Sequence, residues 1–267
     1  MDLSRISINN TAYKEVYLGA SSKGNQAKYT NGEIWIKTNY LGYEDYSEYF
    51  ASKLLEYSNI QGFVKYDLCT FNGKNGCYSK DMLSDEEVLI TLYKILDIYN
   101  ITQKSLDDMN SIQQRFNLVR DAVKDYTGLD ITTYLSNLLA FDAVILNEDR
   151  HFNNIALIYN ETTNSYQEAP IFDNGLGFLA DTNEYRLETS NLINMRNVKA
   201  RPFSSSFKKQ FRILTPTIRF DRDKVMALIE ELNCSDDTKL KRIGYVLNQA
   251  VNNYKDLFED KATTFTI

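Results

Sequence analysis

Residues Leu146–Asn154 read LNEDRHFNN and include His151, the only histidine among the 267 residues of the chain. Helical spacing of apolar residues predicts a buried helix over Asp130–Leu146, directly before this run, and the apolar segment Ile155–Tyr159 predicts a strand directly after it. Polar side chains that follow a helix commonly satisfy its unpaired backbone groups. The run is therefore either an ordinary loop or the chemical centre of the protein, and its neighbours in the sequence decide between the two.

A second polar cluster ends the next predicted strand, where Ala169–Gly175 reads APIFDNG. A strand hairpin between the two clusters brings Asn154 and Asp173 close together. Amide and carboxylate oxygens are hard ligands of the kind that Mg²⁺ takes, and a further carboxylate, Asp149, is available to orient or deprotonate a hydroxyl group. The paired clusters therefore predict a site for phosphoryl transfer.

The segment Asp149–Asn154 reads DRHFNN, which resembles the D-R-H-x-x-N catalytic loop of phosphatidylinositol kinases and of HipA-like bacterial serine/threonine kinases. The longer context, NEDRHFNNIALI followed by APIFDNGLGF, is similar to the HipA-like version, in which DNG stands where eukaryotic protein kinases have DFG. The resemblance implies that Asp149 is the catalytic acid/base, that Asn154 and Asp173 hold the metal, and that the cofactors are ATP and Mg²⁺. It also implies that His151 is a structural member of the loop, bracing the backbone.

The same resemblance implies an α+β, bilobal protein-kinase-like fold, with a small β-rich N-lobe over residues 1–80 and a larger helical C-lobe over residues 81–267. The first part of the chain alternates apolar and polar positions between turns rich in Gly and Asn, which predicts an antiparallel sheet. One helix is predicted within it, over Glu44–Tyr57. By its position, Cys77–Leu83 is expected to be the hinge that hydrogen-bonds adenine through backbone groups.

More helices are expected in the C-lobe. Ser84 and Glu87 fit a capping box, and the apolar residues that follow have helical spacing as far as Tyr99. Another helix is predicted over Ser105–Tyr126, and two C-terminal helices are predicted from about Phe220.

A nucleotide site is expected in the N-lobe. Lys37 ends an apolar strand, and the resemblance implies that it reaches the phosphates and pairs with a glutamate of the next helix, for which Glu48 is the better candidate and Glu44 the second. Between two strands, GASSKGNQAKY occupies the place of a phosphate-covering loop, although it lacks the pattern of a Walker A motif. The phosphate-binding candidates in this loop are Gly19, Ser21, Ser22 and Gly24. In some relatives a serine of this loop is phosphorylated, which makes Ser21 or Ser22 a candidate regulatory site.

Composition limits the classes of function. A net charge of −6 argues against a protein whose whole surface binds nucleic acid or anionic lipid, so no direct nucleic-acid or membrane partner is expected. No apolar run is long enough to span a bilayer, which favours a cytoplasmic location. The three scattered cysteines predict reduced thiols rather than a disulfide framework, and a single histidine leaves no histidine cluster for a metal hydrolase.

One basic segment stands out in this acidic chain. Between Arg196 and Arg219 there is no Asp or Glu. The cations within the segment are Lys199, Arg201, Lys208, Lys209 and Arg212. Such a run is either a solvated face or, because kinases place substrate-binding segments beyond the metal-binding aspartate, a docking surface for an acidic protein or a phosphate-bearing ligand.

The function expected from these features is ATP- and Mg²⁺-dependent phosphorylation of a serine or threonine hydroxyl in a protein substrate. Two alternatives stay open, namely a kinase for lipids or small alcohols, because the loop pattern is shared with phosphatidylinositol kinases, and a nucleotide-binding pseudokinase that only binds partners. Full-length HipA-like toxins carry an additional N-terminal domain that contacts a DNA-binding antitoxin. In this chain the first predicted strand begins near the N-terminus, so we expect a stand-alone catalytic domain or one whose missing part, or antitoxin, is a separate polypeptide.

Overall fold

A computed structural model describes residues 3–9, 12–16 and 26–260 of the chain. In this part of the chain the N-terminal strands form one six-stranded sheet in the order β1-β5-β6-β4-β3-β2. Its strands are β1 (Ile6–Ile8), β2 (Lys14–Val16), β3 (Lys28–Thr30), β4 (Ile34–Thr38), β5 (Asp67–Phe71) and β6 (Lys74–Lys80). All neighbours pair antiparallel except β1 and β5, which are parallel.

The hairpin between β5 and β6 shows how the sequence sets the register of this sheet. Phe71 pairs with Lys74, so the turn consists of Asn72 and Gly73 alone. Both residues have positive φ, 50° and 74°, as a two-residue hairpin turn with the right twist requires. Asn and Gly adopt this conformation at low cost, which explains why the turn forms here.

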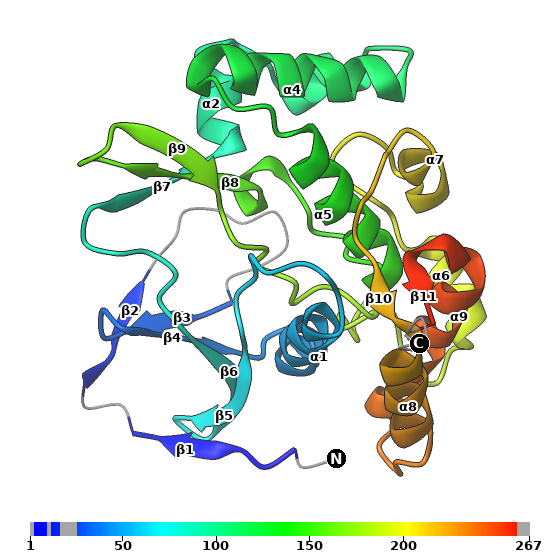
Figure 1. Cartoon of the computed structure of the whole chain (residues 1–267). Coiled ribbons are helices and arrows are strands. Elements are labelled where there is room, and N and C mark those ends of the chain that lie inside the picture. The colour runs from blue at the N-terminus through cyan, green and yellow to red at the C-terminus, as the bar shows by residue number, and fades with distance from the viewer. Residues whose placement is uncertain (1–2, 10–11, 17–25, 261–267) are drawn as a thin grey trace, which may run out of the picture.

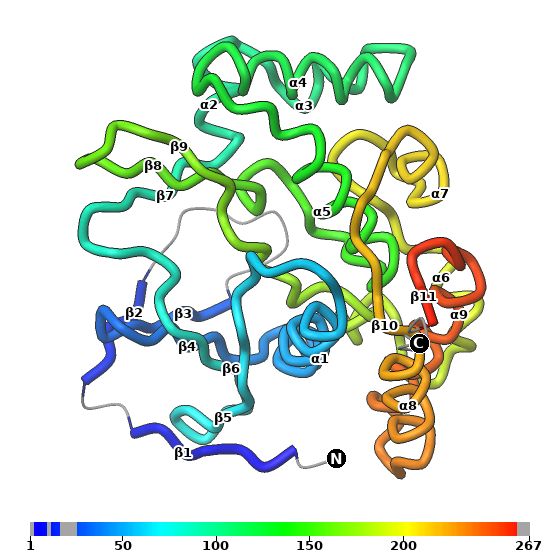
Figure 2. Tube along the Cα trace, in the orientation of Figure 1, coloured from blue at the N-terminus to red at the C-terminus, as the bar shows by residue number. Residues whose placement is uncertain are grey.

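Helix α1 (Glu44–Glu56) lies against β4, β5 and β6, between the six-stranded sheet and the helical part of the molecule (Figures 1 and 2). It agrees closely with the helix predicted from the sequence. Phe50, Leu54 and Leu55 are fully buried. These apolar residues fix which face of α1 packs into the core. They therefore also fix the direction of the polar side chains earlier in the helix, such as Glu48.

The second sheet corrects a prediction. Strand β7 (Glu87–Thr91) pairs with β8 (Ala156–Asn160), which pairs with β9 (Ser165–Glu168). The helix predicted from Ser84 is therefore wrong over its first part, and it begins only at Leu92. The spacing of apolar residues in Glu87–Thr91 fits a helix. Its β-branched residues favour a strand, however, and all five residues pair with the antiparallel strand β8. The carboxylate of Glu87 does accept a hydrogen bond from the backbone N–H of Ser84 (3.0 Å), in a turn that precedes a strand.

The helical part contains elements that were predicted and elements that were not. Helix α2 (Leu92–Ile98) is capped by Thr91, whose hydroxyl accepts a hydrogen bond from the backbone N–H of Lys94. The single helix predicted over Ser105–Tyr126 is wrong in its first turn, because the segment is divided into two helices and the second begins after the cap Ser111.

The remaining helices are α3 (Gln103–Asp107), α4 (Ile112–Thr127), α5 (Thr132–Ile145), α6 (Asn191–Asn197), α7 (Phe207–Phe211), α8 (Arg222–Asn233) and α9 (Thr238–Asn253). Helices α8 and α9 confirm the two predicted C-terminal helices, whereas α6 and α7 were not foreseen. Two residues of β10 (Phe220–Asp221) pair with β11 (Phe258–Glu259), and short 3₁₀ helices lie at Phe152–Asn154 and Lys255–Leu257.

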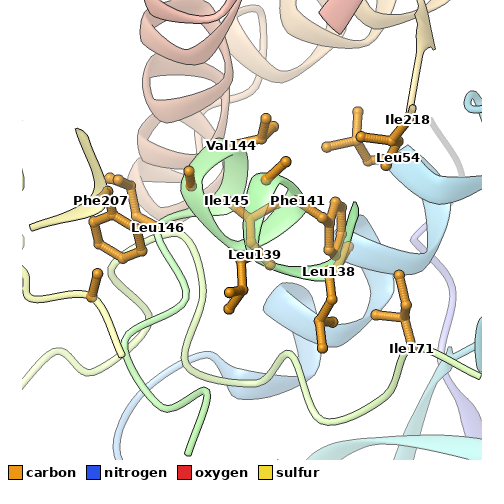
Figure 3. Packing of buried hydrophobic residues seen from close by; sticks show 14 of the residues in the cluster. Leu54, Leu138, Leu139, Phe141, Val144, Ile145, Leu146, Ile171, Phe207 and Ile218 are labelled. Atoms are coloured by element: carbon orange, nitrogen blue, oxygen red, sulfur yellow. The ribbon is translucent and has the colours of Figure 1, made fainter. Parts of the chain in front are cut away.

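Helix α5 forms the centre of the core. Every residue from Tyr134 to Ile145 is buried, as predicted for a central helix that is nearly all apolar on one side. Figure 3 shows Leu138 and Phe141 of this helix in the same part of the core as Leu54 of α1 and Ile171. The core therefore continues from the helical part to α1.

Two expectations drawn from composition also concern the fold. The cysteines Cys69, Cys77 and Cys234 are free thiols, and the first two are buried. Among the helices in the described ranges, none is both long enough and apolar enough to cross a bilayer.

Candidate active site

Lys37 is the centre of a buried charge cluster. It belongs to β4 and is 7% exposed. Its Nζ donates to Oε1 of Glu48 (2.6 Å), to Oδ1 of Asp173 (2.7 Å) and to the hydroxyl of Tyr66 (3.3 Å). Burial alone lowers the pKa of Lys37, but the facing carboxylates of Asp173 and Glu48 outweigh burial and hold that pKa well above its usual value. The lysine is therefore a permanent cation.

The two candidate glutamates of α1 have different contacts. Glu48, which is fully buried, pairs with Lys37 and also accepts a hydrogen bond from the backbone N–H of Asn174 (2.8 Å). Glu44 instead accepts the backbone N–H groups of Tyr40, Leu41 and Gly42, at 2.9, 2.6 and 2.9 Å. The ion pair expected between Lys37 and Glu48 is thus present, and Glu44 holds the loop that leads into the helix.

Asp173 meets two cations. Its Oδ2 lies 3.4 Å from Nζ of Lys28, and its Oδ1 lies 2.7 Å from Nζ of Lys37. Burial would raise the pKa of Asp173, but Lys28 and Lys37 outweigh burial and hold that pKa far below its usual range. Lys28 was missed from the sequence. The signal that identifies it is strand register, because Lys28 is the cross-strand partner of Lys37 and so shares its face of the sheet.

The catalytic-loop candidate begins where α5 ends. Leu146 has φ of 57°, and this left-handed residue ends the helix. The side chain of Asn147 then donates to Oδ1 of Asp142 (3.0 Å) and accepts from the backbone N–H of Asp149 (3.2 Å). Glu148 accepts a hydrogen bond from the hydroxyl of Tyr185 (2.7 Å). These bonds orient the backbone around Asp149, whose side chain is 14% exposed.

Arg150 is the brace of this loop, and the sequence did not identify it. The side chain is fully buried and pairs with Asp142 of α5, with Nε 3.0 Å from Oδ2. It also donates to the carbonyls of Asn154 (2.9 Å) and Phe172 (2.7 Å) and to Oδ1 of Asn174 (2.6 Å). One guanidinium therefore holds the end of the loop and both sides of Asp173 in a fixed arrangement.

His151 is part of the loop as expected, but its ring forms no hydrogen bond with the described residues. Neither ring nitrogen of His151 has a hydrogen-bond partner within the described residues, although both are buried. Nε2 lies 3.7 Å from Oδ2 of Asp149, which is too long for a hydrogen bond. The hydrogen bonds of His151 in the loop come from its backbone, which accepts from the N–H of Asn154 (2.8 Å) and donates to the carbonyl of Asp149 (2.8 Å). Arg150 holds the loop instead, because the five N–H donors of its planar guanidinium can bond to several carbonyl groups at once.

The expected metal ligands have suitable chemistry. The side chain of Asn154 donates from Nδ2 to the carbonyl of Asp149 (2.9 Å), which leaves its amide oxygen as an acceptor. Asp173 supplies a carboxylate that its lysine neighbours keep ionised. An amide oxygen and a carboxylate fit Mg²⁺, which takes hard oxygen ligands and retains several waters. Within the described ranges, no three His, Cys, Asp or Glu side chains gather closely enough to hold a metal by themselves.

Two further expectations concern segments around the charge cluster. The phosphate-binding candidates Gly19, Ser21, Ser22 and Gly24 lie outside the described residues. The expected hinge begins within β6, where Cys77 pairs with Lys37 in register, and it continues into the connection between β6 and β7. Its adenine-binding role stays a prediction.

Comparisons with known proteins give a match only at the level of structure. No protein-family model matches the sequence, and no curated protein matches it. The structure of the Helicobacter pylori proinflammatory kinase CtkA is similar with a TM-score of 0.64 at 16% identity, covering 92% of this chain and 94% of that chain. HipA from Shewanella oneidensis MR-1, in a complex with HipB and operator DNA, gives a TM-score of 0.40 at 11% identity, covering 95% of this chain and 59% of that chain. The similarity to CtkA shows that this chain has the kinase-like α+β fold that its sequence predicted.

Proposed function

We propose that this protein is an ATP- and Mg²⁺-dependent kinase that transfers the γ-phosphoryl group to a serine or threonine hydroxyl of a protein. The observation that carries the proposal is the buried network of Lys37, Glu48 and Asp173 beside the loop that contains Asp149. Each residue has a chemical type that phosphoryl transfer uses. The fold shared with CtkA supports the same class of reaction.

The charge cluster suits a triphosphate. Lys37 is a permanent cation whose position is fixed by Glu48, and Lys28 adds a second cation on the same sheet face. Both would neutralise phosphate oxygens. Because Lys37 is already held in place, little side-chain entropy is lost when a nucleotide binds.

The transfer step uses Asp149. The hydroxyl oxygen of the acceptor forms a bond to the γ-phosphorus, while the bond from that phosphorus to the β,γ-bridging oxygen breaks and ADP leaves with the electron pair. The proton of the acceptor hydroxyl passes to the carboxylate of Asp149. Arg150 keeps that carboxylate in register with the segment that carries Asp173.

Asn154 and Asp173 would hold Mg²⁺, which supplies charge neutralisation on the phosphate oxygens when it is bound. In the structure described here, the carboxylate of Asp173 contacts Lys37 and Lys28. The contact with Lys28 is the longer of the two, so Oδ2 is the oxygen more readily released to a metal.

The test is a transfer assay with the purified chain, labelled ATP and Mg²⁺, supplied in parallel with a protein mixture or with phosphoinositide vesicles. We expect label in the protein mixture. Asp149→Asn and Asp173→Asn should each reduce transfer by about 10²-fold or more, because each removes a group that acts on the reactants. Asp85→Asn, at an exposed position outside the network, is the matched control and should transfer like the parent chain.

The alternatives correspond to other outcomes of this assay. Label only in the lipid fraction would assign a lipid acceptor. Tight ATP binding with no transfer to either acceptor would assign a pseudokinase. If circular dichroism shows that both variants are folded and their transfer is undiminished, the catalytic roles proposed for Asp149 and Asp173 are wrong. An antitoxin or a separate N-terminal subunit as a partner also stays a prediction, and co-purification from the native host would test it.

A further inference from the structure

The basic segment exposes five cations, which we call the basic surface and define as the exposed side chains of Lys199, Arg201, Lys208, Lys209 and Arg212. The chain has no acidic residue between Glu188 and Asp221. In the described part of the protein, none of the five cations forms an ion pair. By contrast, Arg219 and Arg222, which follow in the sequence, pair with Glu259 and Asp260. The basic surface therefore presents charge that the protein itself leaves uncompensated.

The surface is one-sided because its apolar residues point inward. Phe203 is fully buried, and Val198, Ala200 and Phe207 are also buried, while the cations between them are exposed. Phe207 lies in α7, which packs against α5. The buried apolar side chains anchor the segment to the core, unlike those of a freely moving charged loop.

A buried glutamine holds this shape. Gln210 is 1% exposed, and its side-chain oxygen accepts from the backbone N–H groups of Phe203 (3.0 Å) and Ser204 (3.2 Å). Its side-chain nitrogen donates to the carbonyl of Arg201 (2.9 Å). Three hydrogen bonds from one buried amide fix the turn that carries Arg201 next to α7, so less conformational entropy is lost when a partner binds.

The basic surface is attached directly to the catalytic loop. The ring of Phe203 packs edge-on against Phe152, three residues after Asp149, with the centroids 5.9 Å apart. Phe203 also contacts the ring of Phe116 (5.4 Å), and its carbonyl accepts from Arg115 (2.9 Å). A partner bound on the basic surface would thus lie beside the loop that holds the proposed catalytic aspartate.

From these observations we infer that the basic surface is the docking site for an acidic segment of the protein substrate, and that it delivers the acceptor hydroxyl to Asp149. This inference rests on the proposed kinase function. Uncompensated cations attract carboxylates over roughly 8 Å at physiological salt and so speed and orient association. A protein segment is favoured over nucleic acid because the net charge of −6 repels a long polyanion, whereas the basic surface is local.

The first experiment measures binding without catalysis, so that its result does not depend on the proposed reaction. Fluorescence anisotropy would follow a labelled, serine-containing polyglutamate peptide, a serine-containing neutral peptide and a single-stranded oligonucleotide. We expect the acidic peptide to bind most tightly, with an affinity that falls as salt increases. Lys208→Glu/Lys209→Glu should weaken it by about tenfold or more, because attractive contacts become repulsive.

The matched control is Lys94→Glu/Lys241→Glu, which makes the same change of net charge at exposed positions on α2 and α9. It should bind the acidic peptide like the parent chain. Equal weakening by both double variants, no preference for the acidic peptide, or tighter binding of the oligonucleotide would each overturn the inference. Phosphate transfer to the acidic peptide is then measured separately. Peptide binding without transfer would contradict the proposed kinase function while leaving the docking surface in place.

Discussion

Asp173 is the residue at which the charges of the candidate site meet. Its φ of 57° lies in the left-handed region, which is uncommon for a residue other than glycine and places the carboxylate between two lysines. Strain of this kind persists only where neighbouring contacts hold it, and here Asn174 is held by Glu48 and Arg150. The local cost is thus met by the same network that the proposed reaction requires.

The lowered pKa of Asp173 predicts a specific dependence of stability on pH. Burial acts to raise this pKa, but Lys28 and Lys37 lower it below that of an unfolded aspartate, about 3.9. The ionised group therefore contributes stability that is present above about pH 4 and is lost as the pH falls below it. We expect Asp173→Asn to lower the free energy of unfolding by about 1–3 kcal/mol near neutral pH and by progressively less in acid.

Urea denaturation at several pH values would measure this difference. Asp121→Asn, at a surface ion pair, is the control and should change stability by less than about 0.5 kcal/mol at every pH. A stability difference for Asp173→Asn that stays constant into acid would contradict the assignment.

Arg150 gives a second prediction at this scale. Arg150→Met leaves Asp142 buried without its cation, which should lower the free energy of unfolding by about 3–5 kcal/mol. Adding Asp142→Leu removes the uncompensated charge and should restore part of the stability, but transfer should stay low because the bonds to Asn154 and Phe172 are still missing. Urea denaturation and the transfer assay together test this. Full recovery of transfer in the double variant would show that the brace has no positioning role.

The sequence could predict some of these residues and not others. Lys37 and Glu48 follow from the kinase resemblance together with their positions on a strand and on the next helix. Lys28 depends on the register of β3 against β4, which the sequence pattern does not fix. The role of Arg150 depends on which backbone carbonyl groups its side chain reaches. Every residue has a carbonyl group, so the sequence does not indicate these partners.

At the scale of elements, two glutamates in the first half of α1, one turn apart, make different contacts. Glu44 binds three backbone N–H groups of the loop before the helix. Glu48 faces Lys37 and Asn174. The fully buried face of α1, with Phe50 and Leu54, prevents the helix from turning to exchange them.

This division predicts opposite effects for matched substitutions. Glu44→Gln should lower the free energy of unfolding by about 1–2 kcal/mol while phosphate transfer stays within a few-fold of the parent chain, because the lost charge supports only the loop. Glu48→Gln should reduce transfer by about 10²-fold, since Lys37 loses its fixing carboxylate. Thermal unfolding and the transfer assay on both variants test this. The reverse pattern would assign the positioning role to Glu44.

Elements differ in how far sequence periodicity could predict them. Helix α5 was predicted almost to its ends, because a helix buried along its whole length has few alternatives. Strand β7 was mistaken for helix, since Val88 and Leu89 fit both periods and only the pairing with β8 decides. Helices α6 and α7 are too short to give a periodic signal.

At the scale of the whole molecule, backbone contacts join the loop before α1 to the segment that follows Asp173. Gly42 forms a bridge with Asp181, and the backbone N–H of Thr182 donates to the carbonyl of Leu41 (3.1 Å). Next to them, the hydroxyl of Tyr43 donates to the carbonyl of Phe178 (2.7 Å). These contacts join residues that are far apart in the sequence, and for that reason no local pattern predicted them.

Gly42 should therefore tolerate no side chain. A Cβ at this position would collide with the carbonyl oxygen of Ala180 and lie 2.9 Å from Cγ2 of Thr182. We expect Gly42→Ala to lower the free energy of unfolding by about 2 kcal/mol or more, because the obstacle is backbone. Gly62→Ala, where the nearest atom is Cα of Pro170 at 4.0 Å, is the control and should change stability little. Chemical denaturation would measure both, and equal effects would contradict the close approach.

The buried guanidinium of Arg150 has a consequence for enzyme kinetics. Arginine stays protonated at every pH at which a protein is ordinarily assayed. Arg150 can therefore donate to the carbonyl groups of Asn154 and Phe172 at every pH at which the reaction rate is measured. An inflection in the profile of rate against pH would therefore not report a change in the charge of Arg150.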